Sequence, residues 1–324
     1  MTDAFEVTGE FAPAESLSHS DAHSMEATVA LAGNEADVAV SDAPEAPEVP
    51  NGFVELGLAK ELVAAVKDLG YTQPTTVQLK TIPLALPTSS AAQKDGYIDL
   101  MVSSQTGSGK TAAFLLPVLH TLLAQLASAE AAERAEYEQA CADAAAKGEA
   151  PPKRTKRKDP TNPRNFKAPT PGALIVCPTR ELAQQVAHDA IDLVQHCRGL
   201  RIANIVGGMP YQLQIAKLQN ANLVVATPGR LLDLQRSMQI KLDQVQFLVV
   251  DEADRMLDLG FSDDLAEIHQ LTAQRQQTMM FSATFAPRIQ QLAMRVMHDN
   301  GANVKKVQID TPQEKHANIT QSLF

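Results

Sequence analysis

The sequence contains only three cysteines and no run of eighteen consecutive apolar residues. Cys141, Cys177 and Cys197 lack the spacing of metal ligands, and Cys177 lies in an apolar run where a small buried thiol is ordinary. Free thiols suit a reducing compartment. The start of the chain also lacks the basic residues and apolar stretch of a secretion signal. We therefore expect a cytoplasmic protein that does not span a membrane.

The first 52 residues contain no lysine and no arginine, but they contain eleven acidic residues. Large apolar side chains are rare there, so packing cannot offset the entropy that ordering the segment would cost. We predict that residues 1–52 form a disordered acidic tail. Outside this tail 27 acidic residues stand against 28 basic ones, so the formal net charge of −10 describes the tail. The remainder of the chain can therefore still bind a polyanion.

Short β-branched runs alternate with longer amphipathic stretches after Gly52. Runs that are apolar along their whole length are typical of parallel strands covered by helices on both faces. We therefore predict an α/β fold with a parallel sheet, in which ligands bind beyond the carboxyl ends of the strands. The predicted strand segments are 97–104, 173–178, 201–206, 222–228, 246–254, 278–284 and 304–309.

One segment breaks this alternation. Residues 128–170 are first rich in Ala and Glu and then in Pro, Lys and Arg, with KRTKRK at 153–158. We interpret them as a surface insertion whose first part is helical. The basic run could add nonspecific affinity for a nucleic acid backbone, or it could be a solvated loop that balances the acidic tail.

A Gly-rich segment, SQTGSGKT, follows an apolar run and precedes a strong helix pattern, which is the context of a phosphate-binding loop. Gly107 and Gly109 would let backbone N–H groups close around a phosphate at the positive end of the helix. Lys110 would bridge the β- and γ-phosphates, and the Thr111 hydroxyl would hold Mg²⁺. A flexible turn before a helix is the alternative, and Ser104 stands where the general pattern has Gly. The predicted nucleotide-binding residues are Ser104, Gln105, Thr106, Gly107, Ser108, Gly109, Lys110 and Thr111.

The apolar run at 246–250 ends in the acidic residues Asp251 and Glu252. An aspartate at a strand end can bind the Mg²⁺ of the phosphate loop, and an adjacent glutamate can orient and deprotonate the attacking water. A solvated helix cap would explain these carboxylates alone, but not their combination with SQTGSGKT. We predict Lys110, Asp251 and Glu252 as catalytic residues and Thr111 and Asp251 as residues that hold the metal.

Seven collinear elements now make the chain resemble the DEAD-box family of superfamily 2 RNA helicases, bacterial type. The resemblance implies that residues 53–310 form the first, ATP-binding RecA-like domain of such an enzyme. The elements are GYTQPTTVQ (70–78) with Phe53 seventeen residues before it, SQTGSGKT (104–111), PTREL (178–182), GG (207–208), TPGR (227–230), DEAD (251–254) and SAT (282–284).

GYTQPTTVQ is similar to the adenine-reading Q motif of that family. The resemblance implies that the Gln78 carboxamide, which is both a donor and an acceptor, hydrogen-bonds the adenine edge. It implies further that Phe53 stacks on the adenine ring, and we include Tyr71 in the ATP site. Without the resemblance, both aromatics would be interpreted as core residues and Gln78 as a surface residue.

The segments PTREL, GG and TPGR are similar to those with which the family grips the RNA sugar–phosphate backbone. Arginines can bond phosphates, hydroxyls can donate, and glycines let phosphates approach the main chain. Such contacts carry no base code, and each segment alone would be an ordinary cap or turn. The RNA-binding residues implied are Pro178, Thr179, Arg180, Gly207, Gly208, Thr227, Gly229 and Arg230.

The SAT segment resembles the motif that couples the ATP site to strand separation. The resemblance implies hydrogen bonds from the hydroxyls of Ser282 and Thr284 to Asp254. It also implies a second RecA-like domain that supplies an arginine finger, which contributes about 10³- to 10⁵-fold in rate in P-loop enzymes. Residues 311–324 are interpreted as a linker toward that domain, so we expect the chain alone to hydrolyse ATP poorly.

Two other functions remain open. An RNA or protein interaction module could keep the nucleotide fold without turnover, although intact Lys110, Asp251 and Glu252 argue against a decayed site. A DNA-acting P-loop translocase is disfavoured by the Q motif and SAT, but the charge of the chain does not exclude it. The sequence identifies neither the RNA substrate nor any protein partner.

Overall fold

The computed structural model describes residues 51–87, 96–153 and 167–309. Most of the predicted acidic tail, most of the KRTKRK run and residues 311–324 lie outside the described residues, so those predictions are not addressed by the structure.

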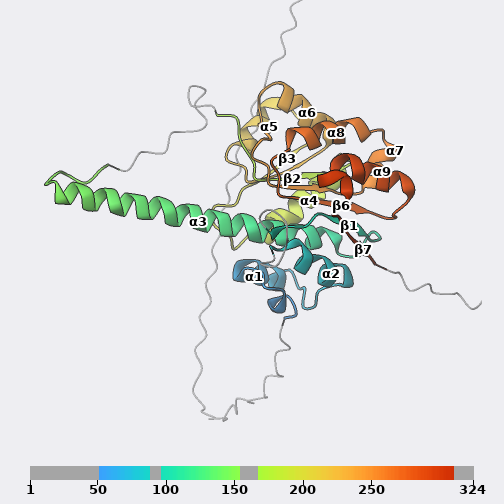
Figure 1. Ribbon diagram of the computed structural model, residues 1–324, viewed down its shortest axis with the longest axis horizontal. Coiled ribbons are helices and arrows are strands. Elements are labelled where there is room, and N and C mark those ends of the chain that lie inside the picture. Colours follow the sequence, from blue (N-terminus) through green and yellow to red (C-terminus); the bar gives the residue numbers. More distant parts are fainter. Residues whose placement is uncertain (1–50, 88–95, 154–166, 310–324) are drawn as a thin grey trace, which may run out of the picture. The chain divides into compact units, whose positions relative to one another are not determined.

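In the described part of the chain, seven strands form one sheet in which every strand pairing is parallel (Figure 1). The order of the strands across the sheet is β3-β4-β2-β5-β6-β1-β7. This confirms the predicted parallel α/β fold. The strands are β1 (Leu100–Ser103), β2 (Ala173–Val176), β3 (Ile202–Ile205), β4 (Leu223–Ala226), β5 (Phe247–Val250), β6 (Gln277–Ser282) and β7 (Lys305–Gln308).

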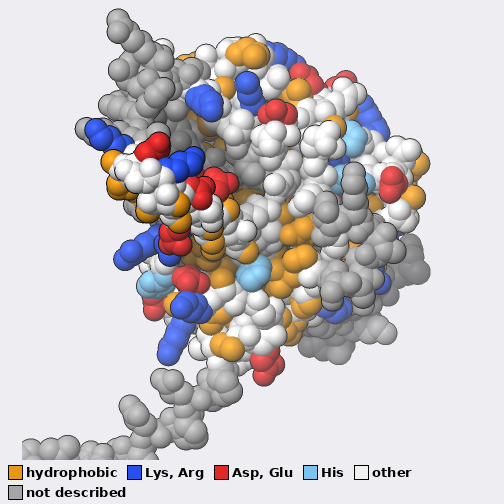
Figure 2. All heavy atoms as spheres, turned by 60° about the vertical axis from the view of Figure 1, so that its left-hand side comes forward, with side chains coloured by type: hydrophobic (Ala, Val, Ile, Leu, Met, Phe, Trp, Pro, Cys, Tyr) orange, Lys and Arg blue, Asp and Glu red, His pale blue; other side chains and the backbone are white. Residues whose placement is uncertain are grey.

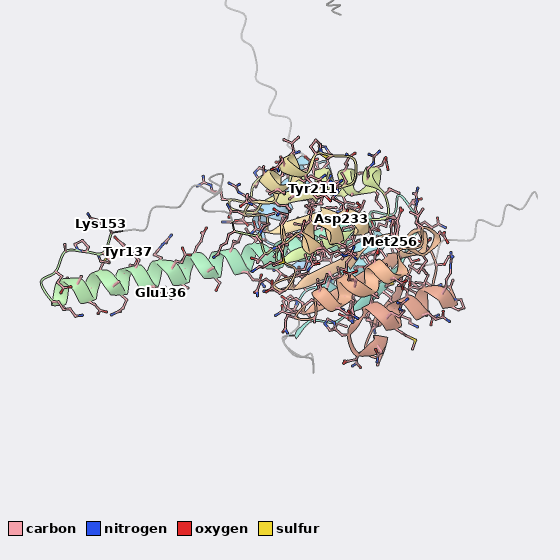
Figure 3. All side chains as sticks on the ribbon, turned by 90° about the horizontal axis from the view of Figure 1, so that it is seen from above. Glu136, Tyr137, Lys153, Tyr211, Asp233 and Met256 are labelled. Carbon is pink, nitrogen blue, oxygen red and sulfur yellow. The ribbon has the colours of Figure 1, made fainter. Side chains whose placement is uncertain are left out.

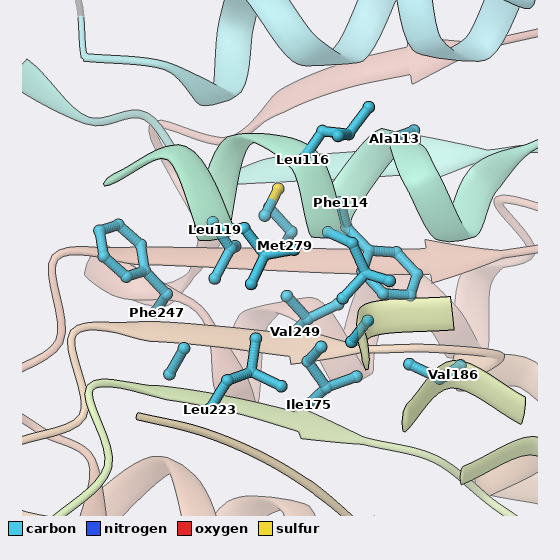
Figure 4. Close-up of a cluster of buried hydrophobic side chains, with 14 of the residues drawn as sticks. Ala113, Phe114, Leu116, Leu119, Ile175, Val186, Leu223, Phe247, Val249 and Met279 are labelled. Atoms are coloured by element: carbon cyan, nitrogen blue, oxygen red, sulfur yellow. The ribbon is translucent and has the colours of Figure 1, made fainter. Parts of the chain in front are cut away.

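Helices cover both faces of the sheet, and successive residues of a strand pack into different layers. In β2, Ile175 packs with the layer of α1 to α4, whereas Leu174 packs with that of α5 to α9. Figure 4 shows part of the first layer, where Phe114 of α3 meets Phe281 of β6 with ring centroids 5.1 Å apart. The helices are η1 (Val54–Leu56), α1 (Lys60–Asp68), α2 (Thr76–Ala85), α3 (Lys110–Ala146), α4 (Arg180–Leu193), α5 (Tyr211–Leu218), α6 (Pro228–Arg236), α7 (Ala253–Asp258), α8 (Ser262–Leu271), α9 (Pro287–Val296) and η4 (His298–Gly301).

Helix α3 begins at the phosphate loop and continues for 37 residues, into the segment interpreted as an insertion. Its buried residues end at Leu122, and the part of α3 that carries Glu136 and Tyr137 extends past the sheet (Figures 1 and 3). The helical start of residues 128–170 is thus a continuation of the helix after the phosphate loop. Among the described residues α3 is also the one helix long and apolar enough to cross a membrane, but half of that apolar window is buried in the fold, as in a core helix.

Charged side chains of both signs are interspersed on the molecular face in Figure 2. This agrees with the near balance of acidic and basic residues outside the tail. Cys177 is buried at the end of β2, and burial, followed by the negative charges of Asp251 and Glu252, raises the pKa of its thiol. An inert buried thiol is therefore the reading that the structure supports.

A polar cluster closes the edge of the sheet at which β1 and β6 begin. The buried Asp99 carboxylate accepts hydrogen bonds from the backbone N–H of Thr278 (2.8 Å) and from Nδ1 of His298 (2.9 Å). The other ring nitrogen of His298, Nε2, lies 2.9 Å from the carbonyl oxygen of Arg275. Because both ring nitrogens face acceptors, the doubly protonated imidazolium fits this site best. The hydrogen bond to Asp99 accordingly raises the pKa of His298.

Arg275 lies at the centre of this cluster and is 4% exposed. Burial lowers the pKa of its guanidinium to about 10. It donates to Nδ1 of His269 at 2.6 Å and to the carbonyl oxygen of Val296 at 2.8 Å. Burial, and then the charges of Arg275 and His298, lower the pKa of His269. The pKa values of His298 and His269 are therefore shifted in opposite directions.

The stability of the fold should depend on pH through His298. Its raised pKa means that its contribution is fully present below its ordinary pKa of about 6.5 and is lost as the pH rises through the folded value. We expect the free energy of unfolding to fall by about 1 kcal/mol over that rise, near the low end for a charged hydrogen bond because part of the ring is exposed. Urea unfolding from about pH 6 to about pH 9 measures this.

His298→Asn should flatten this pH dependence. His269, whose pKa is lowered, acts in the opposite sense, because such a group loses its contribution as the pH falls below its ordinary value of about 6.5. Since His269 is present in both chains, the difference between their slopes isolates His298. The same slope in the variant and in the unmodified chain would show that His298 is not the titrating group.

Candidate functional site

The order of the strands sorts the predicted motifs along one edge of the sheet. The carboxyl ends of β3, β4 and β2 carry GG, TPGR and PTREL, which are the implied RNA contacts. The carboxyl ends of β5, β6 and β1 carry DEAD, SAT and the phosphate loop, which form the implied nucleotide site. Segments far apart in the sequence thus form two adjoining groups, and β2 and β5, which pair directly, join them.

The phosphate loop depends on a glycine at its last position before α3. Gly109 has φ +85° and is the N-cap of α3. A Cβ atom there would lie 2.6 Å from Nε2 of Gln78 and 3.0 Å from Oγ1 of Thr75. Gly107 also has a positive φ, +78°, but nothing lies within 4 Å of the position of its Cβ. Position 109 therefore requires glycine both because of its backbone conformation and because a Cβ would not fit, whereas position 107 requires it because of conformation alone.

Gln78 connects the Q motif to the phosphate loop. Its Nε2 donates to the carbonyl oxygen of Gly109 (3.0 Å), and its Oε1 accepts from the backbone N–H of Thr75 (2.9 Å). The residue is 5% exposed. In this structure its carboxamide atoms serve a capping box at the start of α2 and the loop itself. Hydrogen bonds to an adenine edge would have to replace or share these bonds.

The two aromatics assigned to the ATP site lie in different environments. Phe53 is 1% exposed and belongs to the hydrophobic core in this structure, so a base could stack on it only if the ring became accessible, and its stacking on adenine stays a prediction. Tyr71 is 56% exposed, and its segment is held to the start of the fold because Asn51 Nδ2 donates to the Tyr71 carbonyl oxygen at 3.1 Å. Tyr71 is therefore the aromatic that is accessible to a base.

Lys110 forms ion pairs with both carboxylates of the acidic box. Its Nζ lies 3.2 Å from Oδ1 of Asp251 and 3.5 Å from Oε1 of Glu252. Burial raises the pKa of Asp251, while the nearby Lys110 opposes that rise. The three predicted catalytic residues are thus brought together, although they come from α3 and from the end of β5.

Unpaired buried oxygen atoms surround this cluster. Asp251 is completely buried, and its Oδ2 has no hydrogen-bond partner; the same holds for the buried hydroxyls of Ser104, Ser108 and Ser282. Buried polar atoms normally have partners, so a ligand would satisfy these. No three His, Cys, Asp or Glu side chains within the described ranges gather as a metal site. An Mg²⁺ ion here would therefore depend on phosphate and water oxygens beside Asp251, a coordination that Mg²⁺ commonly has.

Glu252 has a strained backbone. Its φ of +51° is in the left-handed region, where a residue with a Cβ costs about 1 to 2 kcal/mol. Its N–H donates to Oδ1 of Asp251 (2.9 Å), and its Oε2 lies 3.7 Å from Nη1 of Arg255. The strain places two neighbouring carboxylates at Lys110 instead of on opposite sides of a strand.

SAT contacts the phosphate loop through its backbone. The Ser104 N–H donates to the Ser282 carbonyl oxygen (3.1 Å), and the Ser103 hydroxyl donates to the Ala283 carbonyl oxygen (3.1 Å). The predicted hydrogen bonds from Ser282 and Thr284 to Asp254 are absent from the described residues, and the Ser282 hydroxyl has no partner. Bonds from these hydroxyls to Asp254 therefore stay a prediction for another conformation.

The implied RNA-binding residues converge on the loop after β3. Arg180 Nη1 donates to the Gly207 carbonyl oxygen (3.5 Å), and Arg230 Nη1 donates to the Met209 carbonyl oxygen (2.9 Å). Gly208 has φ +80°, and a Cβ there would collide with Arg180. Two arginines that follow different strands therefore meet at one loop.

The remaining implied RNA-binding residues lie at starts of helices. Thr179 caps α4, with its Oγ1 accepting from the Leu182 N–H (3.3 Å), and Thr227 is the N-cap of α6. Gly229 is exposed, with open space around it, whereas Pro178 is buried and therefore positions the turn.

Sequence reasoning missed two residues of this edge. Thr75 completes the capping box with Gln78, and the spacing T-x-x-Q signals such a box. Tyr211 lies under Arg230, with Cζ of the arginine 4.4 Å from the ring centroid. No motif contains Tyr211, so only the fold brings it to Arg230.

The phosphate loop predicts a difference between two glycine substitutions. Gly107→Ala should lower the free energy of unfolding by about 1 kcal/mol through backbone strain alone. Gly109→Ala should cost about 1 kcal/mol more, because its Cβ would also break the hydrogen bond from Gln78. Urea unfolding without nucleotide measures both; equal losses would mean that the contact with Gln78 stabilises nothing.

The aromatics predict a second contrast. Tyr71→Ala should weaken the binding of a fluorescent ATP analogue about fivefold or more, a typical loss for a stacked aromatic, with little change in stability. Phe53→Leu should instead lower the free energy of unfolding by about 1 kcal/mol, because a side chain of different shape packs less well in the core. A larger loss of nucleotide affinity in Phe53→Leu than in Tyr71→Ala, at equal folded fraction, would instead support the predicted stacking of Phe53 on adenine.

Comparison with known proteins gives consistent results. The family model described as DEAD/DEAH box helicase matches residues 75–292. The chain is 37% identical over 255 residues to DEAD-box ATP-dependent RNA helicase 52A of Oryza sativa subsp. japonica, covering 77% of this chain and 36% of that protein. It is 35% identical over 274 residues to ATP-dependent RNA helicase DeaD of Haemophilus influenzae, covering 84% of this chain and 36% of that protein. The chain thus spans about a third of the length of these curated relatives.

Solved structures show the same fold. A DEAD box protein from Methanococcus jannaschii matches with a TM-score of 0.58 and 30% identity, covering 79% of this chain and 55% of that one. Saccharomyces cerevisiae Dbp5 bound to RNA and ADP BeF3 matches with a TM-score of 0.56 and 26% identity, covering 80% and 52%.

Proposed function

Because the chain belongs to the DEAD/DEAH box helicase family, we propose that it is the ATP-binding part of an ATP-dependent RNA helicase and forms one side of its RNA groove. The observation that supports this proposal is the order of the strands: residues predicted to bind nucleotide and residues predicted to bind RNA follow adjacent strand ends on one edge of the sheet. The chain covers 36% of its relatives named above, so unwinding itself is proposed for a longer assembly that includes a second RecA-like domain.

ATP binding would exchange one set of partners of Lys110 for another. The ammonium group now pairs with two carboxylates and would move to the β- and γ-phosphates, where the loop N–H groups and the positive end of α3 also bind. Asp251, released from Lys110 and left with an unpaired buried oxygen, would hold Mg²⁺ together with Thr111. The ion would offset the negative charge of the phosphates. Beside Asp251, its positive charge would replace that of the Lys110 ammonium group.

Glu252 would orient the attacking water and accept its proton. Its carboxylate is partly exposed and is released by the same movement of Lys110. Asp251 is fully buried and cannot do this while it holds the ion. The two acidic residues therefore have separate roles that follow from their burial.

RNA would bind to Arg180, Arg230, Thr179, Thr227 and the glycines between them. These groups offer N–H and O–H donors to phosphate and sugar oxygens and no fixed pattern for a base edge, so we expect little sequence specificity. The near-zero net charge of the chain outside the tail is consistent with binding by a few placed cations.

Coupling between the two sites would run through β6, which lies between β5 and β1. SAT is already joined to the start of the phosphate loop by the bond from the Ser104 N–H to the Ser282 carbonyl oxygen, and to the end of β1 by the Ser103 hydroxyl. The hydroxyls of Ser282 and Thr284 would hydrogen-bond Asp254 when nucleotide and RNA bring the two RecA-like domains together. A closure of this kind would turn the unpaired Ser282 hydroxyl into a contact made only in the active state.

An ATPase assay in trans tests the proposed function. We expect the chain alone to bind ATP and hydrolyse it slowly, and to show RNA-stimulated hydrolysis when mixed with the part of a full-length relative that it does not match. An arginine supplied by that part would account for the difference, about 10³-fold or more. Glu252→Gln should lower the RNA-stimulated hydrolysis rate about 10²-fold or more, while nucleotide still binds.

The outcomes separate the candidate functions. Full RNA-stimulated turnover by the chain alone would contradict the half-site proposal. ATP binding without turnover in any mixture would favour the interaction module. Equal stimulation by RNA and DNA oligonucleotides of matched sequence would favour a translocase that acts on both.

A further inference from the structure

Two arginines reach the loop after β3, but they are held differently. Arg180 makes a long contact of 3.5 Å to Gly207 and a 3.9 Å ion pair with the exposed Glu181, and its side chain is 57% exposed. Arg230 makes a 2.9 Å hydrogen bond to the Met209 carbonyl oxygen and is only partly exposed. Arg230 is thus the more firmly placed cation of the implied RNA surface.

The second contact of Arg230 is an aromatic ring. Its Cζ lies 4.4 Å from the ring centroid of Tyr211, within the range of a cation–π interaction. Tyr211 is the first residue of α5 and is 41% exposed; it is labelled at the periphery of the fold in Figure 3. The buried residues of α5 are Gln214 and Leu218. The Tyr211 ring is therefore not part of the buried core, and one of its faces contacts Arg230.

Among the described residues Arg230 makes no hydrogen bond besides that to Met209, so its remaining donors are available to a ligand. A guanidinium carries five N–H donors in one plane, and the bond to Met209 uses one of them. A free arginine side chain loses about 2 kcal/mol of rotamer entropy when it is fixed, and this loss weakens any contact that requires the fixed geometry. The Tyr211 ring and the Met209 carbonyl fix the plane of the Arg230 guanidinium before RNA binds, so its free N–H groups are already oriented.

We propose that Tyr211 is a positioning residue for RNA binding, which holds the guanidinium of Arg230 in the plane that presents its free N–H groups to a backbone phosphate. This inference rests on the proposed function, because it takes RNA as the ligand of this edge. It adds to that function a residue outside every recognised motif. The ring acts through its face, so the Tyr211 hydroxyl is dispensable.

RNA affinity of three single variants of the full 324-residue chain tests this. The probe is a fluorescent single-stranded oligouridylate, measured by anisotropy at low salt. Tyr211→Leu should weaken binding about two- to fivefold, the factor that corresponds to an exposed cation–π contact. Tyr211→Phe should bind like the unmodified chain. Leu213→Ala removes another exposed apolar side chain of α5 (55% exposed) and should change nothing.

A double variant distinguishes positioning from a general structural effect. In an Arg230→Ala background, Tyr211→Leu should have no further effect on RNA affinity, because Tyr211 acts through the arginine. Urea midpoints of Tyr211→Leu and Leu213→Ala should agree. Additive losses, or a loss in Tyr211→Phe equal to that in Tyr211→Leu, would overturn the inference and point to direct contact or to the hydroxyl.

The two proposals fail in different ways. No RNA binding by the unmodified chain would contradict the proposed RNA groove and this inference with it. RNA binding that is unchanged in Tyr211→Leu would contradict the inference alone.

Discussion

All strands of a parallel sheet end at the same edge, and the positions of the functional residues depend on this constraint. The strands follow an order that differs from the sequence, so residues separated by more than a hundred positions become neighbours, as Lys110 and Asp251 do. The constraint also divides the edge: three adjacent strand ends carry the arginines and glycines predicted to bind RNA, and three carry phosphate-loop and carboxylate groups. The β2–β5 pairing joins the two groups.

The cluster of Lys110, Asp251 and Glu252 shows how the site remains stable without a ligand. Asp251 is fully buried, and an isolated carboxylate there would be costly. Lys110 compensates that charge by forming an ion pair with Asp251. Binding of ATP and Mg²⁺ would separate the two residues. The left-handed backbone of Glu252 and the unpaired oxygens of Asp251 and Ser282 are other costs of this arrangement. A bound ligand or closure would give the unpaired oxygens partners, which is consistent with a binding site rather than a structural cluster.

The sheet and the location of the site could be predicted from sequence, because both follow from local patterns. Unbroken apolar runs predicted buried parallel strands, and glycine with lysine before a helix predicted the loop that Gly109 and Lys110 form. Contacts that depend on the conformational state could not be predicted in this way. The resemblance assigned Phe53 to the base and Asp254 to Ser282, yet Phe53 is packed in the core and the Ser282 hydroxyl is free. Gln78 binds Gly109 where the resemblance implied adenine. Tyr211 was missed because its partner Arg230 comes from another strand end, and no local pattern records that meeting.

A crystal structure of the chain with Mg²⁺, a non-hydrolysable ATP analogue and a single-stranded RNA tests the central claim most directly. The account predicts the nucleotide at the ends of β5, β6 and β1, with Lys110 on its phosphates and Asp251 beside the ion, and the RNA backbone at the ends of β3, β4 and β2 against Arg180 and Arg230. RNA bound elsewhere, for example along the exposed part of α3, or Lys110 still paired with Asp251 in the nucleotide complex, would contradict it.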